Sequence, residues 1–186
     1  MEYELIRSAR RTLGAEIKNG RLIVRAPYLA SKRDIERFLA SQSGRIEKAL
    51  AVSREAEERK AAVPKLTQAE LRTLAAEARR IIPERCAYFA PLVGVRYGRI
   101  TIRSQRTRWG SCSAKGSLSF NCLLMKAPPA VLDGVVVHEL CHIRQPNHSA
   151  KFYSEVLRVL PDYKERQKWL RQNGELLMAM LPDKAE

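Results

Sequence analysis

The sequence predicts an α+β fold, because β-rich runs occur both at the N-terminus and among segments with the periodicity of amphipathic helices. The first 26 residues contain three short β-rich runs, and Asn19-Gly20 separates the last two. An Asn-Gly pair in that position is typical of a β-hairpin, since both residues tolerate a positive φ. Two more β-rich runs, 98–104 and 116–124, lie between the predicted helices. We therefore expect small sheets combined with helices.

The first two predicted helices each begin with a capping box, in which a hydroxyl residue and an acidic residue three positions later satisfy free amides. Ser31 and Asp34 provide the first pair, and Thr67 and Glu70 provide the second. The apolar residues expected to face inward are Ile35, Phe38, Leu39, Ile46 and Leu50 in the first helix, and Leu71, Leu74, Ala78 and Ile81 in the second.

A charged segment, 53–62, follows the first helix and either extends it or forms a joint. We therefore predict two domains: a β-hairpin and helix subdomain, 1–62, and a larger domain, 63–186. Pro83 is expected to end or kink the second helix, because proline cannot donate a backbone hydrogen bond inside a helix.

The larger domain is predicted to contain two strands, 98–104 and 116–124, joined by a polar loop, 105–115. Three further helices follow the second strand, because apolar residues recur there at helical spacing after typical helix-starting residues. The expected starts of these helices are, in order, Pro128-Pro129, Ser149 and Pro161.

Composition predicts a cytoplasmic protein without a membrane span. The longest apolar-rich runs are about ten residues, whereas a membrane helix needs ~18. The N-terminus is charged where a signal peptide would need an apolar core. Cys86, Cys112, Cys122 and Cys141 lack C-x-x-C spacing, so we expect free thiols, most of them buried.

The net charge of +14 is unevenly distributed. No Asp or Glu occurs between Arg85 and Leu132, and residues 98–126 carry six basic side chains. An acid-free basic segment favours an anionic partner such as nucleic acid, a nucleotide or an acidic peptide. The alternative is that this charge only maintains solubility.

The stretch HELCHIRQPNH, 138–148, contains all three histidines of the chain. On a helix, residues i and i+4 lie about 40° apart around the axis and ~6 Å apart along it. His138 and His142 can therefore direct a ring nitrogen at one point, where zinc requires Zn–N distances of ~2.0–2.1 Å in tetrahedral geometry. Glu139 lies beside the first ligand, where it can reach a metal-bound water without binding the metal.

The third histidine, His148, can join the site only if the chain turns back, since a straight helix would carry it ~15 Å further along the axis. Pro146 and Asn147 interrupt the helix before it, because proline cannot continue a helix and asparagine tolerates a turn. Three protein ligands leave a fourth position for water, which is typical of catalytic zinc sites.

Such a site predicts hydrolysis, in which zinc lowers the pKa of water and Glu139 acts as general base. Arg108, Trp109 and Tyr153 are candidates to stabilise the developing anion or to shape the pocket. Two alternatives remain open for the histidines: they serve as packing residues, or they hold a metal without catalysis. For the pocket candidates the alternative is an ordinary structural role: Arg108, Trp109 and Tyr153 are equally plausible as loop or core residues.

Two segments, RTRWGSCSAKGSLSFN and APPAVLDGVVVHELCHIRQPNHSAKFY, resemble the YgjP-like metal-dependent hydrolases, relatives of the SprT and WLM zinc peptidases. The N-terminal RRTLGAEIKNGRLIVRAPY also resembles that family, so the likeness extends over nearly the whole chain. It implies a zincin-like metallopeptidase core with an active-site helix, a small antiparallel sheet and C-terminal helices. It also implies zinc, one per chain, on His138, His142 and His148, with Glu139 as base.

The same resemblance implies that the strand GSLSFNCLL, 116–124, is an edge strand that accepts an extended peptide, so that Phe120 and Asn121 contact substrate. The basic loop before this strand would border the cleft. A purely structural hairpin is the alternative.

We therefore expect a zinc metallopeptidase acting on extended polypeptides. One alternative is a metal-dependent phosphohydrolase acting on nucleotides, although the chain lacks a G-x-x-x-x-G-K-[ST] loop. Another is a nucleic-acid-associated protease or binding module, although aromatic residues make up only 6% of the chain, which is a weak signal for base stacking. Manganese, nickel or cobalt remain open as substitutes for zinc, and the sequence gives no oligomeric state.

Overall fold

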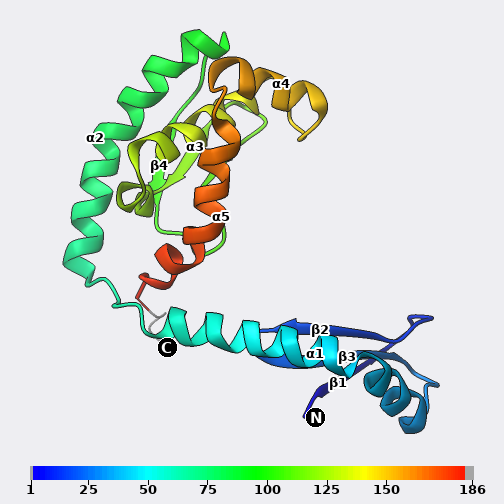
Figure 1. Ribbon diagram of the computed structural model, residues 1–186. Coiled ribbons are helices and arrows are strands. Elements are labelled where there is room, and N and C mark those ends of the chain that lie inside the picture. The colour runs from blue at the N-terminus through cyan, green and yellow to red at the C-terminus, as the bar shows by residue number, and fades with distance from the viewer. Residues whose placement is uncertain (1, 183–186) are drawn as a thin grey trace. The chain divides into compact units, whose positions relative to one another are not determined.

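The computed structural model describes residues 2–182, and the chain divides into two compact units, Met1–Ala62 and Val63–Glu186. Each unit has its own cluster of buried apolar side chains. Both units combine strands with helices (Figure 1), so the predicted α+β class is confirmed. Among residues 2–182, no helix combines the length and the apolar character that crossing a bilayer requires.

The first unit contains a three-stranded mixed sheet. Strands β1 (Glu4–Ser8), β2 (Gly14–Lys18) and β3 (Arg21–Pro27) are arranged in the order β1-β3-β2. Strand β1 runs parallel to β3, and β2 runs antiparallel to it. Asn19 and Gly20 have φ values of 51° and 72° in the β2–β3 turn, which confirms the predicted hairpin because such turns need positive φ at both central residues.

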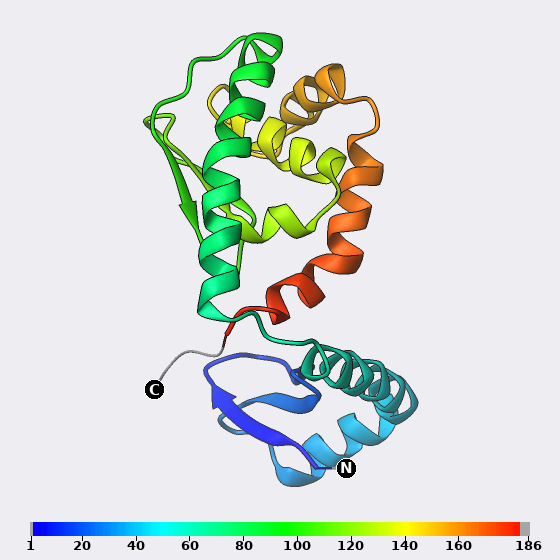
Figure 2. The ribbon, with the colours of Figure 1, turned by 90° about the vertical axis from the view of Figure 1, so that its left-hand side faces the viewer.

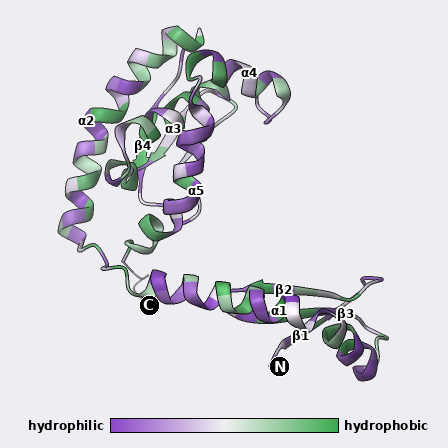
Figure 3. Cartoon of the chain, viewed as in Figure 1, coloured by the Kyte–Doolittle hydropathy of each residue, from purple (hydrophilic) through white to green (hydrophobic). Residues whose placement is uncertain are grey.

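One helix, α1 (Lys32–Ala61), covers this sheet. It begins at the predicted capping box, where the Ser31 hydroxyl accepts a hydrogen bond from the amide of Asp34. The charged segment 53–62 extends the helix rather than ending it. Hydrophobic and hydrophilic segments alternate along α1 in Figure 3, as expected of an amphipathic helix. Alternate residues of β3 and one face of α1 form the core, namely Leu22, Val24, Ala26, Ile35, Leu39, Ile46 and Leu50.

The second unit begins with α2 (Gln68–Val93), which starts at the predicted capping box of Thr67 and Glu70. Pro83 was predicted to end or kink this helix. It does not end the helix, because α2 continues for ten residues beyond it. Burial of one continuous face on both sides of Pro83 outweighs the loss of one backbone hydrogen bond. The residues buried on that face are Leu74, Ala78, Ile82, Cys86, Phe89, Ala90 and Val93, so Ile82 rather than Ile81 enters the core.

The second sheet differs from the expected antiparallel one. Its strands, β4 (Ile100–Arg103), β5 (Gly110–Cys112) and β6 (Leu118–Asn121), are arranged in the order β4-β6-β5. Strands β5 and β6 form a hairpin, and β4 lies parallel to β6 on its other side. The sheet is mixed because the loop predicted between two strands contains a third, β5, which takes the antiparallel place beside β6.

This arrangement also corrects the prediction that 116–124 forms an edge strand. Strand β6 is central, and the chain after it forms a 3₁₀ helix, η1 (Cys122–Lys126). The two edges of the sheet are β4 and β5. The short β5 has neither the length nor the β-branched residues that would have marked it as a strand.

Three helices complete the unit: α3 (Pro129–Cys141), α4 (Ala150–Val159) and α5 (Tyr163–Ala179). Their starts agree with the prediction to within two residues, and the Ser149 hydroxyl caps α4 by accepting from the amide of Phe152. Figures 1 and 2 show α3 between α2 and α5, and α3 is the most deeply buried of the three helices. This central helix carries His138, and His142 caps its C-terminal end.

Candidate metal centre and substrate cleft

Three imidazole rings meet at the C-terminal end of α3. His138 lies on the last turn of the helix, and His142 is its C-terminal cap. The chain then turns, with the amide of Gln145 donating to the carbonyl of Cys141, and brings His148 back toward the helix. The Nε2 atom of His138 lies 3.1 Å from Nε2 of His142 and 3.1 Å from Nε2 of His148.

These three nitrogen atoms fit the ligand set of a single metal ion. All lie within 4.8 Å of one another. Two nitrogen ligands at ~2.0–2.1 Å from a tetrahedral zinc ion lie about 3.3 Å apart, which is close to the observed spacing. Imidazole nitrogen is a ligand that zinc prefers. The geometry is therefore suited to a tetrahedral ion that keeps a fourth position for another ligand.

The side chain of Phe152 supports all three rings. Its ring centroid lies 4.5 Å from that of His142, 4.8 Å from that of His138 and 4.9 Å from that of His148. Phe152 is completely buried in the core. Because Ser149, immediately after the third histidine, caps the start of α4, the same turn positions both His148 and the aromatic ring that supports it.

The outer ring nitrogens have partners that orient the inner ones. Nδ1 of His142 lies 3.1 Å from the carbonyl oxygen of Gln145, so this nitrogen must carry the proton and donate it. Nε2 of His142 is then unprotonated and free to bind a metal. Nδ1 of His138 lies 2.7 Å from the hydroxyl of Tyr163 on α5. Hydrogen bonds of this kind hold ligand rings in the orientation that a metal needs.

Burial controls the charge of the site. Burial, followed by the neighbouring His142 and His148, lowers the pKa of His138 to about 3. Burial also lowers the pKa of His142. Both rings are therefore neutral near pH 7, which is the form that binds a metal.

Glu139 faces the opposite constraint, because burial disfavours its charged form. Its side chain is only 6% exposed, and burial raises its pKa to about 7, although the positive charge of Arg108 acts in the other direction. A carboxyl group with this pKa accepts and releases a proton near neutral pH.

Gly110, the first residue of β5, provides space for the Glu139 carboxyl group. A methyl group on Gly110 would lie 2.6 Å from both Cγ and Oε1 of Glu139, closer than side-chain atoms approach one another. The absence of a side chain at residue 110 therefore allows the edge strand to pass directly beside the acid.

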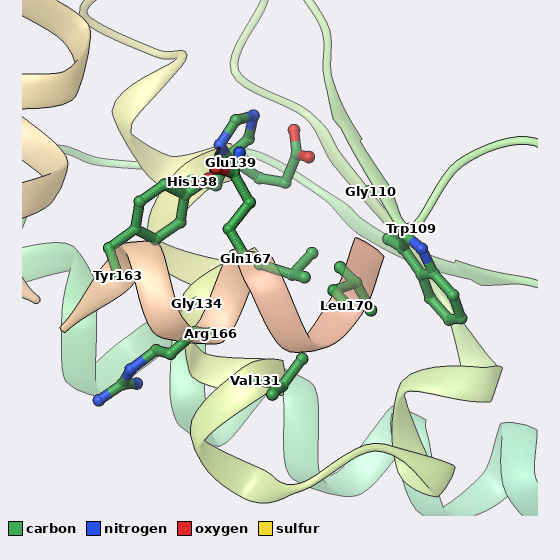
Figure 4. Close-up of a pocket in the computed structure, with 11 residues that line it drawn as sticks. Trp109, Gly110, Val131, Gly134, His138, Glu139, Tyr163, Arg166, Gln167 and Leu170 are labelled. Carbon is green, nitrogen blue, oxygen red and sulfur yellow. Dashed lines mark hydrogen bonds between the residues drawn. The ribbon is translucent and has the colours of Figure 1, made fainter. Parts of the chain in front are cut away.

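Two cavities adjoin these residues. A groove of about 520 Å³ runs between residues 110–114 of the β5 segment and the three histidines. A second cavity, of about 220 Å³, lies between α3, α5 and Trp109 (Figure 4). Both are lined by Gly110, His138 and Glu139. The edge strand that borders the site is thus β5, not the predicted 116–124 strand.

The predicted substrate-binding residues occupy different positions. Trp109 lines the smaller cavity, and its indole ring lies against Gly174 of α5. The ring of Tyr153, on α4, stacks on that of His148 with a centroid distance of 6.2 Å. Arg108 is exposed, and its charge influences Glu139.

Phe120 and Asn121 correct the prediction, because they are 1% and 2% exposed and line neither cavity. Phe120 belongs to the core. The side-chain amide of Asn121 donates to the carbonyl oxygens of Gln105 (2.6 Å) and Arg108 (3.2 Å). Asn121 therefore shapes the loop before β5 instead of contacting substrate.

One face of α5 lines the site and was not predicted to be functional. The residues on this face are Tyr163, Gln167, Leu170 and Gly174, which recur at helical spacing. Figure 4 shows the Gln167 side chain extending from α5 toward His138 and Glu139. The spacing of these residues is visible in the sequence, but a polar residue and a glycine on an otherwise apolar face were the only signals.

Known proteins that resemble this chain are metallopeptidases. Residues 58–173 match the family described as YgjP-like, metallopeptidase domain. Two solved structures, the metallopeptidase zymogens abylysin of Pyrococcus abyssi and jannalysin of Methanocaldococcus jannaschii, are each 20% identical to the chain with a TM-score of 0.45. They cover 50% of this chain and 94% and 97% of their own chains, respectively.

No curated protein sequence matches the chain. The family match covers more than half of the sequence and includes the three histidines, Glu139, β5 and most of α5. On this basis, the chain belongs to the YgjP-like metallopeptidase family.

Proposed function

We propose that this protein is a zinc-dependent peptidase in which His138, His142 and His148 hold the metal and Glu139 is the general base. The observation that carries the proposal is the convergence of three histidine Nε2 atoms beside a buried carboxyl group. The family match supports metal-dependent peptide hydrolysis over the alternative of nucleotide hydrolysis. The four cysteines are all free thiols, which fits the further proposal of a cytoplasmic enzyme.

Zinc, when bound, supplies a Lewis acid that polarises a peptide carbonyl and lowers the pKa of water. Glu139 takes up a proton from the attacking water on its carboxylate and returns it to the leaving amine. Its raised pKa makes both transfers accessible near neutral pH. Tyr163 and Gln145 hold the histidine rings through their Nδ1 atoms. Gly110 keeps the acid and the edge strand in direct contact.

The backbone of β5 is suited to binding an extended polypeptide. The backbone amide of Asn121 donates to the carbonyl of Trp109, and the backbone amide of Ser113 donates to the carbonyl of Ser117. These two hydrogen bonds define the bonded pairs of the β5–β6 ladder. Since bonded and non-bonded pairs alternate in an antiparallel ladder, the amides of Gly110 and Cys112 point away from β6. An added peptide strand would pair with these amides at the free edge of β5, whose residues also line the groove.

The test uses the full chain, its Glu139→Gln and His148→Ala variants, and an unfolded polypeptide such as reduced, alkylated casein. Glu139→Gln should keep its metal and lose about 10²–10⁴-fold in cleavage rate, because the proton acceptor is removed. His148→Ala should lose most of its metal and its activity together. Mass spectrometry for metal content and for peptide products measures both effects.

Glu165→Gln is the matched control, since Glu165 is exposed at the start of α5 and lines neither cavity. It should cleave at the wild-type rate. Cleavage by Glu139→Gln as fast as wild type would contradict the proposed base. Hydrolysis of nucleotides without any cleavage of polypeptide would favour the phosphohydrolase instead. Reconstitution with zinc, manganese, nickel and cobalt in turn would identify the preferred metal.

A further inference from the structure

We propose that the smaller cavity is a specificity pocket that binds one uncharged apolar side chain next to the cleaved peptide bond. This inference rests on the proposed peptidase function and adds a substrate class to it. The pocket lies between α3 and α5, with Trp109 at one end.

The position of the pocket links it to the reacting centre. It shares Gly110, His138 and Glu139 with the groove that borders the three histidines. A peptide in the groove therefore passes the mouth of the pocket at the residue closest to Glu139. Successive side chains of an extended peptide point to opposite sides, so one side chain adjoining the cleaved bond enters the pocket while its neighbours do not.

The lining is apolar where a substrate side chain would lie. Its walls are formed by Trp109, Val131, Val135 and Leu170. A charged side chain that entered would lose its hydration without gaining a partner among these groups, which is costly. The pocket therefore selects against Asp and Glu, and it selects against Lys and Arg unless they reach Glu139, which the pocket shares with the groove.

The one cation of the lining, Arg166, is already engaged. Its Nε donates to Asp162 (2.9 Å), and its Nη1 donates to the carbonyl of Ala130 (2.8 Å). Figure 4 shows the guanidinium directed away from the other labelled residues, so only the aliphatic stem of Arg166 lines the pocket. The stem packs against Gly134, where a methyl group would lie 3.3 Å from Cβ of Arg166. An acidic substrate side chain thus finds no free counter-charge.

The size of the pocket limits its occupant to a single side chain. Its volume of about 220 Å³ is below the ~300–1,000 Å³ of pockets that hold whole small-molecule ligands. Trp109 closes one end by lying against Gly174, with its Nε1 and Cζ2 atoms 3.2 Å from the position of a methyl group on that residue. Leucine, methionine and phenylalanine are the side chains that combine apolar character with sufficient length.

The experiment compares cleavage sites for the full, zinc-loaded protein and for two variants of opposite effect. Leu170→Phe fills the pocket, and Leu170→Ala enlarges it. Products from a complex mixture of unfolded polypeptides, identified by mass spectrometry, should show enrichment of leucine, methionine or phenylalanine at one position adjoining the cleaved bond. Leu170→Phe should reduce cleavage at such sites by about 10-fold or more relative to sites with alanine there, and Leu170→Ala should favour phenylalanine.

Leu176 supplies the matched control, since it is exposed on the same helix and does not line the pocket. Leu176→Phe and Leu176→Ala should cleave at the same sites as the wild type. Cleavage with no residue preference beside the bond, or a preference that the Leu170 variants leave unchanged, would overturn the pocket and leave the proposed peptidase intact.

A binding measurement tests the pocket separately from catalysis. In a Trp169→Phe background, Trp109 is the remaining tryptophan, and its fluorescence reports on the pocket. N-acetyl-leucinamide should change this fluorescence at concentrations where N-acetyl-lysinamide does not, and Leu170→Phe should abolish the change. Selective binding without any polypeptide cleavage would support the pocket and refute the peptidase. Equal responses to both amides, or none, would overturn the pocket.

Discussion

Burial of Glu139 lowers the stability of the folded protein when the carboxyl group is charged, but it also prepares this group for proton transfer. A glutamate on the most apolar helix of the unit is buried beside Gly110, and burial raises its pKa to about 7. Buried carboxyl groups of this kind destabilise the folded state whenever they are charged. The cost is expected to be visible in protein from which metal has been removed by a chelator.

The sign of this effect follows from the direction of the pKa shift. The pKa of Glu139 rises from its ordinary 4.5 to about 7 on folding, so the folded state binds more protons between these values. The associated stability is complete below about pH 4.5 and is lost as the pH rises through about 7. The whole effect amounts to at most about 3 kcal/mol.

Glu139→Gln should therefore stabilise the metal-free protein at pH 8.5 by up to about 3 kcal/mol, because glutamine stays neutral. The difference between the variants should vanish as the pH approaches 4.5. Chemical unfolding followed by tryptophan fluorescence measures it, since both tryptophans lie in the second unit. Protonation of His138 at low pH lowers the free energy of unfolding of both proteins. The difference in this free energy between wild type and Glu139→Gln therefore isolates the effect of residue 139. A constant difference at every pH would show that Glu139 is not titrating as described.

At the scale of elements, α5 and α4 support a site whose histidines lie elsewhere. Tyr163 at the start of α5 contacts Nδ1 of His138, and Phe152 of α4 contacts all three imidazole rings. Such outer contacts orient metal ligands and raise their affinity. Their removal should weaken metal binding without removing a ligand.

Tyr163→Phe is the specific test, because it keeps the buried ring and deletes only the hydroxyl. We expect zinc affinity to fall by about 10–100-fold, measured by competition with a chromophoric chelator. Tyr88→Phe, at an exposed tyrosine of α2, should bind zinc as the wild type does. An unchanged affinity in Tyr163→Phe would mean that the hydroxyl does not orient His138.

A different prediction concerns the edge strand β5, where substrate binding is expected to depend on the backbone rather than on side chains. Cys112→Pro removes an amide that points away from β6 and leaves the bonded pairs of the hairpin in place. Because that amide is proposed to pair with the substrate backbone, KM should rise. Cys112→Ala removes the thiol but keeps the amide, and steady-state cleavage of a fluorogenic peptide compares the two. The proline variant should lose at least ten times more in kcat/KM than the alanine variant, and equal losses would contradict the pairing.

At the scale of the whole molecule, the division into two units separates the chemistry from the N-terminal sheet. The core of the second unit consists of its own residues, and all the residues that line the two cavities lie in that unit. A unit with its own core and a complete site is expected to fold alone.

The fragment 63–186 should therefore fold cooperatively and bind about one zinc ion with the affinity of the full chain. Circular dichroism and metal analysis test this expectation, with the His148→Ala fragment as the control for specific binding. A fragment that is unfolded, or that folds without binding zinc, would show that the site depends on the first unit.

Much of this protein could be predicted from local signals in its sequence. The Asn19-Gly20 turn and the capping boxes at Ser31 and Thr67 were predicted because each depends on residues only a few positions apart. The same is true of the histidines: i and i+4 spacing followed by Pro146 is enough to suggest that three rings meet, and the structure brings their Nε2 atoms together. Their role as zinc ligands remains a prediction.

Only the tertiary structure decided which strand borders the site and which residues line it. Strand β5 exists because it pairs with β6, and Phe120 and Asn121 are buried because that pairing places β6 in the middle of the sheet. Helix α2 continues through Pro83 because its buried face extends on both sides. Strand order and burial depend on contacts between residues far apart in the chain, whereas turns, caps and ligand spacing depend on neighbours, and only the latter can be recognised in the sequence by itself.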